Sequence, residues 1–193
     1  MTNYQAPLVW RKNHPFFKNN APQKLQNWLT GPESLTQALT CTCTEQFSVH
    51  VLQESWQKPT NNERLTLNLA PNTLAFVRQV HLLCGSQPWV YARTVIPQET
   101  LKGELQKLTQ LGTQPLGAIL FNNKLIHRSD IELTKIKTTH KTHQAALTHS
   151  PPSTEQVWGR RSLFHIANKP LIVNEIFLPA IQTKKTKILC KQH

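Results

Sequence analysis

The chain has 193 residues and a formal net charge of +12. This length is typical of one domain, which usually has about 100–200 residues. No segment approaches the roughly 18 consecutive apolar residues of a membrane-spanning helix. The first residues, MTNYQAPLVWRKNH, also lack the apolar stretch of a secretory signal, so we expect a single cytoplasmic domain.

Much of the basic charge lies in two places, residues 124–141 and a tail at residues 184–193. Neither place is interleaved with the aromatic residues that stack on single-stranded nucleic acid, and no helix-turn-helix or zinc-finger signature is present. We interpret most of this charge as a solvated surface and expect no nucleic-acid partner. The tail leaves one alternative open, a transient contact with an anionic membrane surface, to which each lysine would add ~1 kcal/mol.

The cysteine and histidine patterns indicate neither a zinc site nor structural disulfides. Two of the cysteines are too close in sequence for an ordinary bridge, and no CxxC pair is present. Thr, Lys and Gln surround the clustered histidines, so we expect no metal site and four reduced thiols. The residues concerned are Cys41, Cys43, Cys84, Cys190, His140, His143 and His149.

The first elements predicted along the chain are an arm, two helices and a strand. Residues 1–20 are polar and contain prolines, so we expect a loosely held arm. QKLQNWLT (residues 23–30) is a short amphipathic helix, and GPESLTQALT (residues 31–40) is a second helix with Pro32 in its first turn. EQFSVHVLQESW (residues 45–56) alternates as a strand does.

Two β-hairpins follow, and they are the clearest features of the pattern. TLAFVRQVHLLC and PWVYARTVIP are strand-like and are joined by the turn residues Gly85 to Pro88. RRSLFHI and LIVNEIFLP, joined by ANKP, form the second hairpin. Between the hairpins we predict a helix at residues 98–112, a short turn or helix at QPLGAILF, a strand at residues 131–137 and a long loop at residues 139–155.

Hairpins with helices between them predict an α+β domain, in which helices lie on one side of an antiparallel sheet. We assign this domain to residues 21–183, with residues 134–157 as a His-rich inserted loop and residues 184–193 as a basic tail. No internal repeat is apparent, in agreement with one domain.

Charged residues fall on apolar strand faces in both hairpins. Alternation in PLIVNEIFLPA places Glu175 on one face with Val173 and Phe177. In TLAFVRQVHLLC it places Arg78 among apolar residues in the same way, and Arg93 in the partner strand repeats the pattern less cleanly.

A buried ion without a partner costs several kcal/mol, so each of these charged side chains must contact a group of opposite charge or a hydrogen-bond partner. One interpretation is structural, in which Arg78 and Glu175 pair with each other. The other is functional: a closed pocket in which a ligand brings an anionic end to Arg78 and a hydroxyl end to Glu175, with an apolar ring between them. Periodicity does not choose between the two.

Several segments, taken in order, resemble the chorismate pyruvate-lyase family of bacterial enzymes, which commit chorismate to ubiquinone synthesis. These segments are WLTGPESLTQAL, FVRQVHLLCGSQPWVYARTVIPQETL, QPLGAILF and VWGRRSLFHIANKPLIVNEIFLPA. The resemblance runs from about Trp28 to Ala180, and WGRRS together with the FLPA ending is its most specific part.

The resemblance implies removal of pyruvate from chorismate to leave 4-hydroxybenzoate, without a metal or an organic cofactor. It implies a six-stranded antiparallel sheet with helices on one face, and a tightly held product enclosed under two helix-turn-helix flaps. In the family, the arginine matching Arg78 binds the ring carboxylate and the glutamate matching Glu175 contacts the hydroxyl end. Backbone groups at the positions matching Leu35 and Leu116 complete the site. We expect Arg93 to meet the enolpyruvyl carboxylate, although a surface ion pair fits it equally well.

The chain departs from the family pattern in two places. The position of Leu35 is more often methionine, so this wall of the pocket is less pliable. Between Leu133 and Trp158 the chain is also longer than the enterobacterial pattern, and the extra length is the His-rich loop.

A second class of function remains, a sensor of small aromatic acids. The effector-binding domains of one large family of bacterial repressors share this fold, but they follow a winged-helix domain, for which the stretch before Trp28 is too short. Incubation with chorismate separates the two classes, because only an enzyme releases pyruvate. As partners we expect chorismate and 4-hydroxybenzoate, with the protein a monomer.

Overall fold

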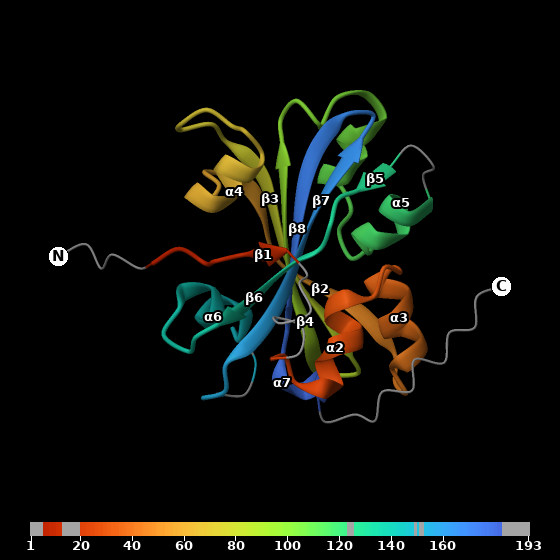
Figure 1. The fold of residues 1–193 in the computed structure, drawn as a ribbon. Coiled ribbons are helices and arrows are strands. Elements are labelled where there is room, and N and C mark those ends of the chain that lie inside the picture. Colours follow the sequence, from red (N-terminus) through yellow and green to blue (C-terminus); the bar gives the residue numbers. More distant parts are fainter. Residues whose placement is uncertain (1–5, 13–19, 123–125, 149, 151–152, 183–193) are drawn as a thin grey trace.

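The computed structural model describes residues 6–12, 20–122, 126–148, 150 and 153–182, which form one antiparallel sheet with helices packed against it (Figure 1). The sheet has eight strands in the order β1-β6-β7-β8-β4-β3-β2, and β5 pairs with β7. The strands are β1 (Arg11–Lys12), β2 (Phe47–Gln57), β3 (Ala75–Cys84), β4 (Gln87–Pro97), β5 (Ile126–Arg128), β6 (Glu132–Ile136), β7 (Val157–Ile166) and β8 (Lys169–Phe177).

The expectation of six strands is wrong, because two very short strands extend the sheet. β1 comes from the predicted arm and pairs with β6, with Arg11 opposite Leu133. β5 pairs with β7, with Ile126 opposite Ile166. Segments of two and three residues are too short to show alternation, so only their tertiary neighbours reveal them.

Both predicted hairpins are confirmed, and they form the centre of the sheet. β3 and β4 join at a tight turn in which Gly85 has φ of +59°. β7 and β8 join at Ala167 and Asn168, whose φ values of 47° and 65° match the twist of the flanking strands. The two hairpins meet where β4 pairs with β8, with Ala92 opposite Glu175.

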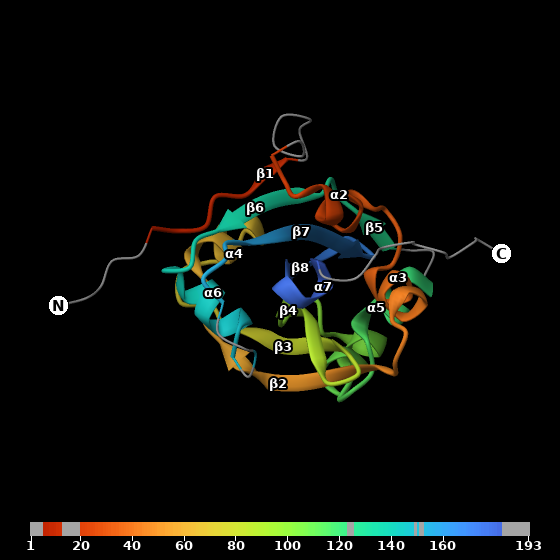
Figure 2. The same ribbon diagram turned by 90° about the horizontal axis from the view of Figure 1, so that it is seen from below.

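Helices cover both faces of the sheet, so the expectation of helices on one face is wrong (Figure 2). We call the face toward α2, α3, η1 and α5 the α3 face, and the face toward α4 and α6 the α4 face. The helices are α2 (Gln23–Thr30), α3 (Leu35–Thr42), α4 (Asn61–Thr66), the 3-10 helix η1 (Gly103–Thr109), α5 (Leu116–Asn122), α6 (Lys141–Ala146) and α7 (Pro179–Gln182).

Three helical segments differ from the sequence prediction. The helix expected at residues 98–112 is reduced to η1. The loop expected at residues 139–155 contains α6, which begins after His140 caps its first turn. α4 was not predicted; it begins with a capping box, in which Thr60 and Glu63 bond to each other's backbone N–H groups. Such short helices have no apolar stripe long enough to recognise.

The predicted membrane contact rests on the basic tail, residues 184–193, which lies outside the described residues. Within the described ranges, no helix is long and apolar enough to cross a membrane.

The core consists of four apolar clusters, two on each face of the sheet. On the α3 face, Val80 and Phe177 belong to a cluster under α2 and α3, whereas Phe76 and Val173 belong to a cluster under η1 and α5. Between the two clusters of each face, a row of polar and charged side chains runs across neighbouring strands. Each face therefore has a polar belt at its middle.

The expectation of four reduced thiols is wrong. Cys43 and Cys84 form a disulfide with their Cα atoms 5.5 Å apart, and Cys41 is also disulfide-bonded. Cys43 is the C-cap residue of α3, and Cys84 is the last residue of β3. The packing of α3 on the sheet brings the pair together, and sequence spacing does not reveal it.

Replacing both Cys43 and Cys84 by serine should destabilise the protein. The bridge closes a loop with a sequence separation of 41 residues, and the chain-entropy relation gives about 4 kcal/mol for such a loop. The melting temperature under non-reducing conditions should therefore fall by about 10 °C. Equal melting temperatures for the variant and the parent would contradict the bridge.

Candidate functional site

A cavity lies on the α3 face between its two apolar clusters. Arg78 on β3 stands between residues of the two clusters, and Glu175 stands in the same way between Val173 and Phe177 on β8. Strand alternation therefore predicted correctly that both charges face an apolar layer. The lining residues are Leu35, Thr36, Arg78, Val80, Leu82, Ala92, Thr94, Pro115, Leu116, Gly117, Leu120, Arg128, Arg160, Phe164, Val173 and Glu175.

Small residues on β4 leave space between the two charges. β4 lies between β3 and β8, with Thr94 opposite Arg78 and Ala92 opposite Glu175. Two strand spacings and an offset of two residues place the Cα atoms of Arg78 and Glu175 roughly 12 Å apart.

Arg78 is buried and only partly satisfied by protein groups. Its Nε donates to Oε1 of Glu54 at 2.8 Å, and its Nη2 donates to the carbonyl oxygens of Gly112 at 2.7 Å and Gln114 at 3.1 Å. Burial lowers the pKa of Arg78, and the bond to Glu54 opposes that shift. No residue in the described ranges accepts a hydrogen bond from Nη1. That nitrogen is available to an anion in the cavity.

Glu175 is also bonded on one side only. Its Oε2 accepts a hydrogen bond from Nε of Arg160 at 2.5 Å, while Oε1 has no partner among the residues that the structure describes. Nη1 of Arg160 continues to the carbonyl oxygens of Trp28 at 2.8 Å and Gly31 at 3.1 Å. Glu175 thus pairs with Arg160, and the structural interpretation in which it pairs with Arg78 is wrong.

Arg128 on β5 adds a third guanidinium to the cavity. Its Nε donates to Oγ of Ser162 at 2.9 Å, and its Nη1 donates to the carbonyl oxygen of Pro32 at 3.1 Å. The guanidinium also lies over the ring of Phe164, 5.4 Å from its centroid. Burial and the neighbouring charge of Arg160 lower the pKa of Arg128 to about 10.

The lining of the cavity carries more positive than negative charge. Arg78, Arg128 and Arg160 face a single lining carboxylate, Glu175. Glu54 balances Arg78 from the neighbouring strand β2 without lining the cavity. A site with excess guanidinium charge favours an anionic ligand.

Leu35 and Leu116 form the roof of the cavity, and each is the first residue of a helix. The second predicted helix begins at Leu35 because Ser34 caps it, accepting a hydrogen bond from the N–H of Gln37. First-turn N–H groups have no partner within the helix, so both leucines expose backbone donors near the cavity. A side chain at Gly117 would meet Oγ1 of Thr36 at 2.8 Å, so glycine allows α5 to approach α3.

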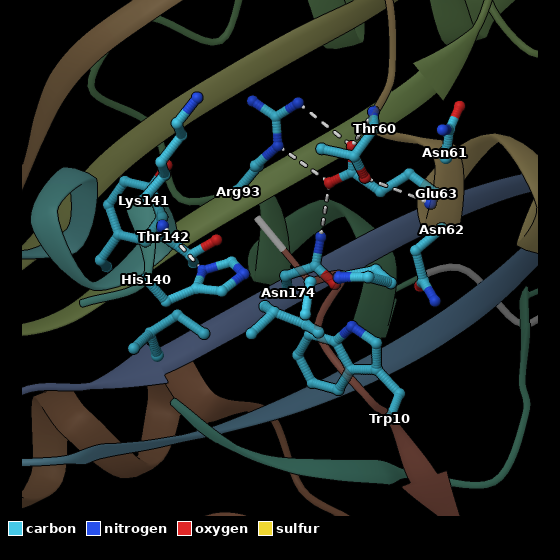
Figure 3. A pocket seen from close by; sticks show the side chains of 15 residues that line it. Trp10, Thr60, Asn61, Asn62, Glu63, Arg93, His140, Lys141, Thr142 and Asn174 are labelled. Atoms are coloured by element: carbon cyan, nitrogen blue, oxygen red, sulfur yellow. Dashed lines mark hydrogen bonds and ion pairs between the residues drawn. The ribbon is translucent and has the colours of Figure 1, made fainter. Parts of the chain in front are cut away.

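Arg93 does not lie in this cavity. Its side chain projects from the α4 face, where Nε and Nη2 donate to the two oxygens of Glu63 at 2.8 and 3.1 Å (Figure 3). Burial by itself would lower the pKa of Arg93, but the hydrogen bonds to Glu63 raise it above its usual value. The structure thus brings together Arg78, Glu175, Leu35 and Leu116 and separates Arg93 from them.

Arg128 and Arg160 were missed as site residues. The quoted motif WGRRS contains Arg160 and Arg161, but sequence does not tell which of them faces the cavity. The register decides it, because Arg160 lies opposite Glu175 whereas Arg161 lies opposite Asn174. Arg128 carried no sequence signal, since β5 is too short to show a face.

The family model described as chorismate lyase matches residues 8–187. The chain belongs to the chorismate lyase family. A protein of Nitrosomonas europaea called "Probable chorismate pyruvate-lyase" is 36% identical over 176 residues, 91% of this chain and 96% of that protein. A protein of the same name from Marinobacter nauticus is 41% identical over 154 residues, 80% of this chain and 76% of that protein.

Solved structures share the fold of this chorismate lyase family member. The C-terminal domain of a histidine utilization repressor from Pseudomonas syringae pv. tomato has a TM-score of 0.57 and 9% identity, covering 74% of this chain and 98% of that domain. A GntR family transcriptional regulator from Bacillus cereus has a TM-score of 0.53 and 7% identity, covering 76% and 100%. At this identity the likeness shows the fold alone.

The cavity is narrow. Its volume is about 50 Å³, whereas pockets that hold drug-sized ligands usually have about 300–1,000 Å³. A ring compound therefore needs an outward movement of the cavity wall.

Benzoate affinity should fall as the pH rises through about 10. Arg128 is cationic below its pKa and neutral above it, and a bound anion shifts the transition slightly upward because it stabilises the cation. Calorimetric titration at pH 8 and pH 11 should show a loss on the order of 10-fold. Benzoate keeps its charge over this range, so the change reports on the protein.

The Arg128→Met variant is the matched control for that titration. Its benzoate affinity should be weaker at pH 8 and should change much less between pH 8 and pH 11. A parent protein with constant affinity would refute the role of Arg128 in anion binding.

Proposed function

We propose that this protein is a chorismate pyruvate-lyase, which converts chorismate to 4-hydroxybenzoate and pyruvate as the first committed step of ubiquinone biosynthesis. Membership in the chorismate lyase family supports this reaction class. The observation that carries the proposal is one cavity with two groups that have no partner among the described residues, the donor Nη1 of Arg78 and the acceptor Oε1 of Glu175.

The reaction needs positioning more than strong acid–base chemistry. The C–O bond between the ring and the enolpyruvyl group breaks, and the adjacent ring carbon, which bears the hydroxyl, loses its proton. A third ring double bond forms and makes the product aromatic. The leaving enolpyruvate takes up a proton on its methylene carbon and becomes pyruvate. Because aromatisation drives the reaction, holding the substrate in a dry, polarised site supplies the main catalytic effect.

Each lining charge has a role in this proposal. Nη1 of Arg78 binds the ring carboxylate with a charge-assisted hydrogen bond. Oε1 of Glu175 accepts a hydrogen bond from the ring hydroxyl and orients the proton that leaves the same carbon. Arg128 binds the enolpyruvyl carboxylate in place of Arg93, because Arg128 lines the cavity and Arg93 does not. Backbone N–H groups at Leu35 and Leu116 complete the contacts from the roof.

Substrate entry requires the roof to move outward, since the cavity in its present form is too small for chorismate. α3 and α5 are short helices of eight and seven residues, and they contact each other above the ligand space. We propose that they separate to admit chorismate and close over it. Closure excludes water and strengthens the interactions of the arginines with both carboxylates.

A sensor of aromatic acids is the second candidate. The repressor domain with a TM-score of 0.57 and the transcriptional regulator with a TM-score of 0.53 favour it only as far as fold is concerned. Such a sensor would bind 4-hydroxybenzoate in the same cavity but would release no pyruvate from chorismate.

Purified protein incubated with chorismate should release pyruvate and 4-hydroxybenzoate in equal amounts, and Arg78→Ala should abolish this activity. Loss of a buried cation that binds the substrate carboxylate should lower kcat/KM on the order of 100-fold or more. A coupled pyruvate assay measures turnover, and titration with 4-hydroxybenzoate measures product affinity.

Arg11→Ala is the matched control, because Arg11 is an exposed arginine on β1 that lines neither cavity. Its turnover should equal that of the parent. Melting curves of both variants show whether Arg78→Ala remains folded, since Glu54 loses its partner. Near-normal turnover and product affinity in a folded Arg78→Ala protein would exclude the proposed role.

Glu175→Gln should lower activity more than stability. Glutamine keeps the size of the side chain but weakens the bond to Arg160 and the acceptor for the substrate hydroxyl. We expect kcat to fall roughly 10-fold or more, because a positioned acid–base group usually contributes about 100-fold and above. The melting temperature should change little. The control is Glu132→Gln, which alters a comparable pair with Arg161 outside the cavity. A larger loss of stability than of activity would assign Glu175 to structure.

A further inference from the structure

A second and larger cavity lies on the α4 face, behind the first one. Its volume is about 420 Å³, within the range of pockets that hold small molecules. Its walls come from the polar belt of β4 and β8, the start of α4, the start of α6, and arm residues that include Leu8 and Trp10 (Figure 3). None of the residues assigned to chorismate lines it.

The pattern of this face repeats that of the α3 face. Arg93 stands on β4 between Tyr91 of one apolar cluster and Val95 of the other. Asn174 stands in the same way on β8, between residues of these two clusters. The strand pattern that marks the first cavity therefore marks the second as well.

Arg93 and Glu63 neutralise each other inside this cavity, and the further cation of its lining, Lys141, is exposed. Glu63 accepts two hydrogen bonds from Arg93, and its Oε2 also accepts one from the backbone N–H of Thr60 at 2.9 Å. Burial raises the pKa of Tyr91 to about 12, and burial lowers the pKa of His140, so both are uncharged near neutral pH. The buried part of the cavity therefore offers no strong attraction to an ion and suits an uncharged ligand.

One polar atom of the lining is left without a partner. Nδ2 of Asn174 donates to Oε1 of Glu63 at 3.1 Å, and this bond fixes the orientation of the amide because a carboxylate only accepts. Oδ1 is buried and accepts no hydrogen bond from the described residues, although the side chain is only 6% exposed. A buried acceptor without a partner costs about 1–3 kcal/mol, which a ligand donor would recover.

We propose that this cavity is a second binding site, for a small uncharged molecule with an apolar ring and one O–H or N–H donor. The ring packs among Leu8, Trp10 and Ile176, and the donor bonds to Oδ1 of Asn174 when the ligand enters beside the arm. This site is independent of the proposed lyase reaction, because its residues project from the opposite face of β4 and β8.

The test uses two probes, 4-fluorophenol and 4-fluoroanisole, in the second of which a methyl group replaces the hydroxyl hydrogen and so removes the donor. Fluorine NMR titration of the full chain should show tighter binding of 4-fluorophenol by roughly 5-fold, the value of one neutral hydrogen bond. In Asn174→Leu, which keeps the pair of Arg93 with Glu63, the two probes should bind equally. An unchanged preference in that variant would overturn the assignment of Oδ1.

Two cavity-filling variants locate the binding. Thr142→Trp places a large side chain in the second cavity and should abolish binding of both probes. Ala92→Leu fills the first cavity instead and should leave probe binding unchanged. The proposal fails if 4-fluorophenol does not bind the parent at 10 mM, or if Ala92→Leu, and not Thr142→Trp, removes binding. Circular dichroism of each variant establishes that it is folded.

Discussion

Buried charge at the middle of apolar strands is the constraint on which the rest of this structure depends. An ion there costs several kcal/mol unless the fold brings partners to it, and the partners come from distant segments. Arg78 receives Glu54 from β2 and two carbonyl oxygens from the loop before α5. Glu175 receives Arg160 from β7, and Arg160 in turn holds the end of α2. Within the described part of the chain, these bonds leave Nη1 of Arg78 and Oε1 of Glu175 without a partner, which gives the first cavity its chemical character.

The two faces of the sheet meet this constraint differently. On the α3 face, the lining arginines outnumber the lining carboxylates, and the roof consists of short helices. On the α4 face, Glu63 neutralises Arg93 through two hydrogen bonds. Oδ1 of Asn174 accepts no hydrogen bond from the described residues. The first arrangement suits a dianion that aromatises when it loses its side chain. The second suits an uncharged molecule. Because alternate residues of β4 and β8 serve the two cavities, one pair of strands separates the two chemistries.

Much of the fold and part of the site could be predicted from local patterns. Both hairpins, α2, and the positions of Arg78 and Glu175 on apolar faces follow from alternation over ten or so residues and from turn chemistry. The short elements β1, β5, α4 and α6 were not recognised, since strands of two or three residues show no alternation and helices of six residues have no apolar stripe. Arg93 was misplaced because alternation gives two faces but does not say which one holds the ligand. Arg128 and Arg160 needed the register of β5 and β7.

The sequence by itself determined that charges would be buried in strands, and family resemblance supplied the reaction to expect. Local spacing carries this information, because a strand alternates its side chains whatever it pairs with. The tertiary structure decided which ion meets which partner, that Cys43 and Cys84 are joined, that helices cover both faces, and that two cavities lie back to back. These features depend on residues that lie far apart in the chain and meet only when strand order and register are fixed.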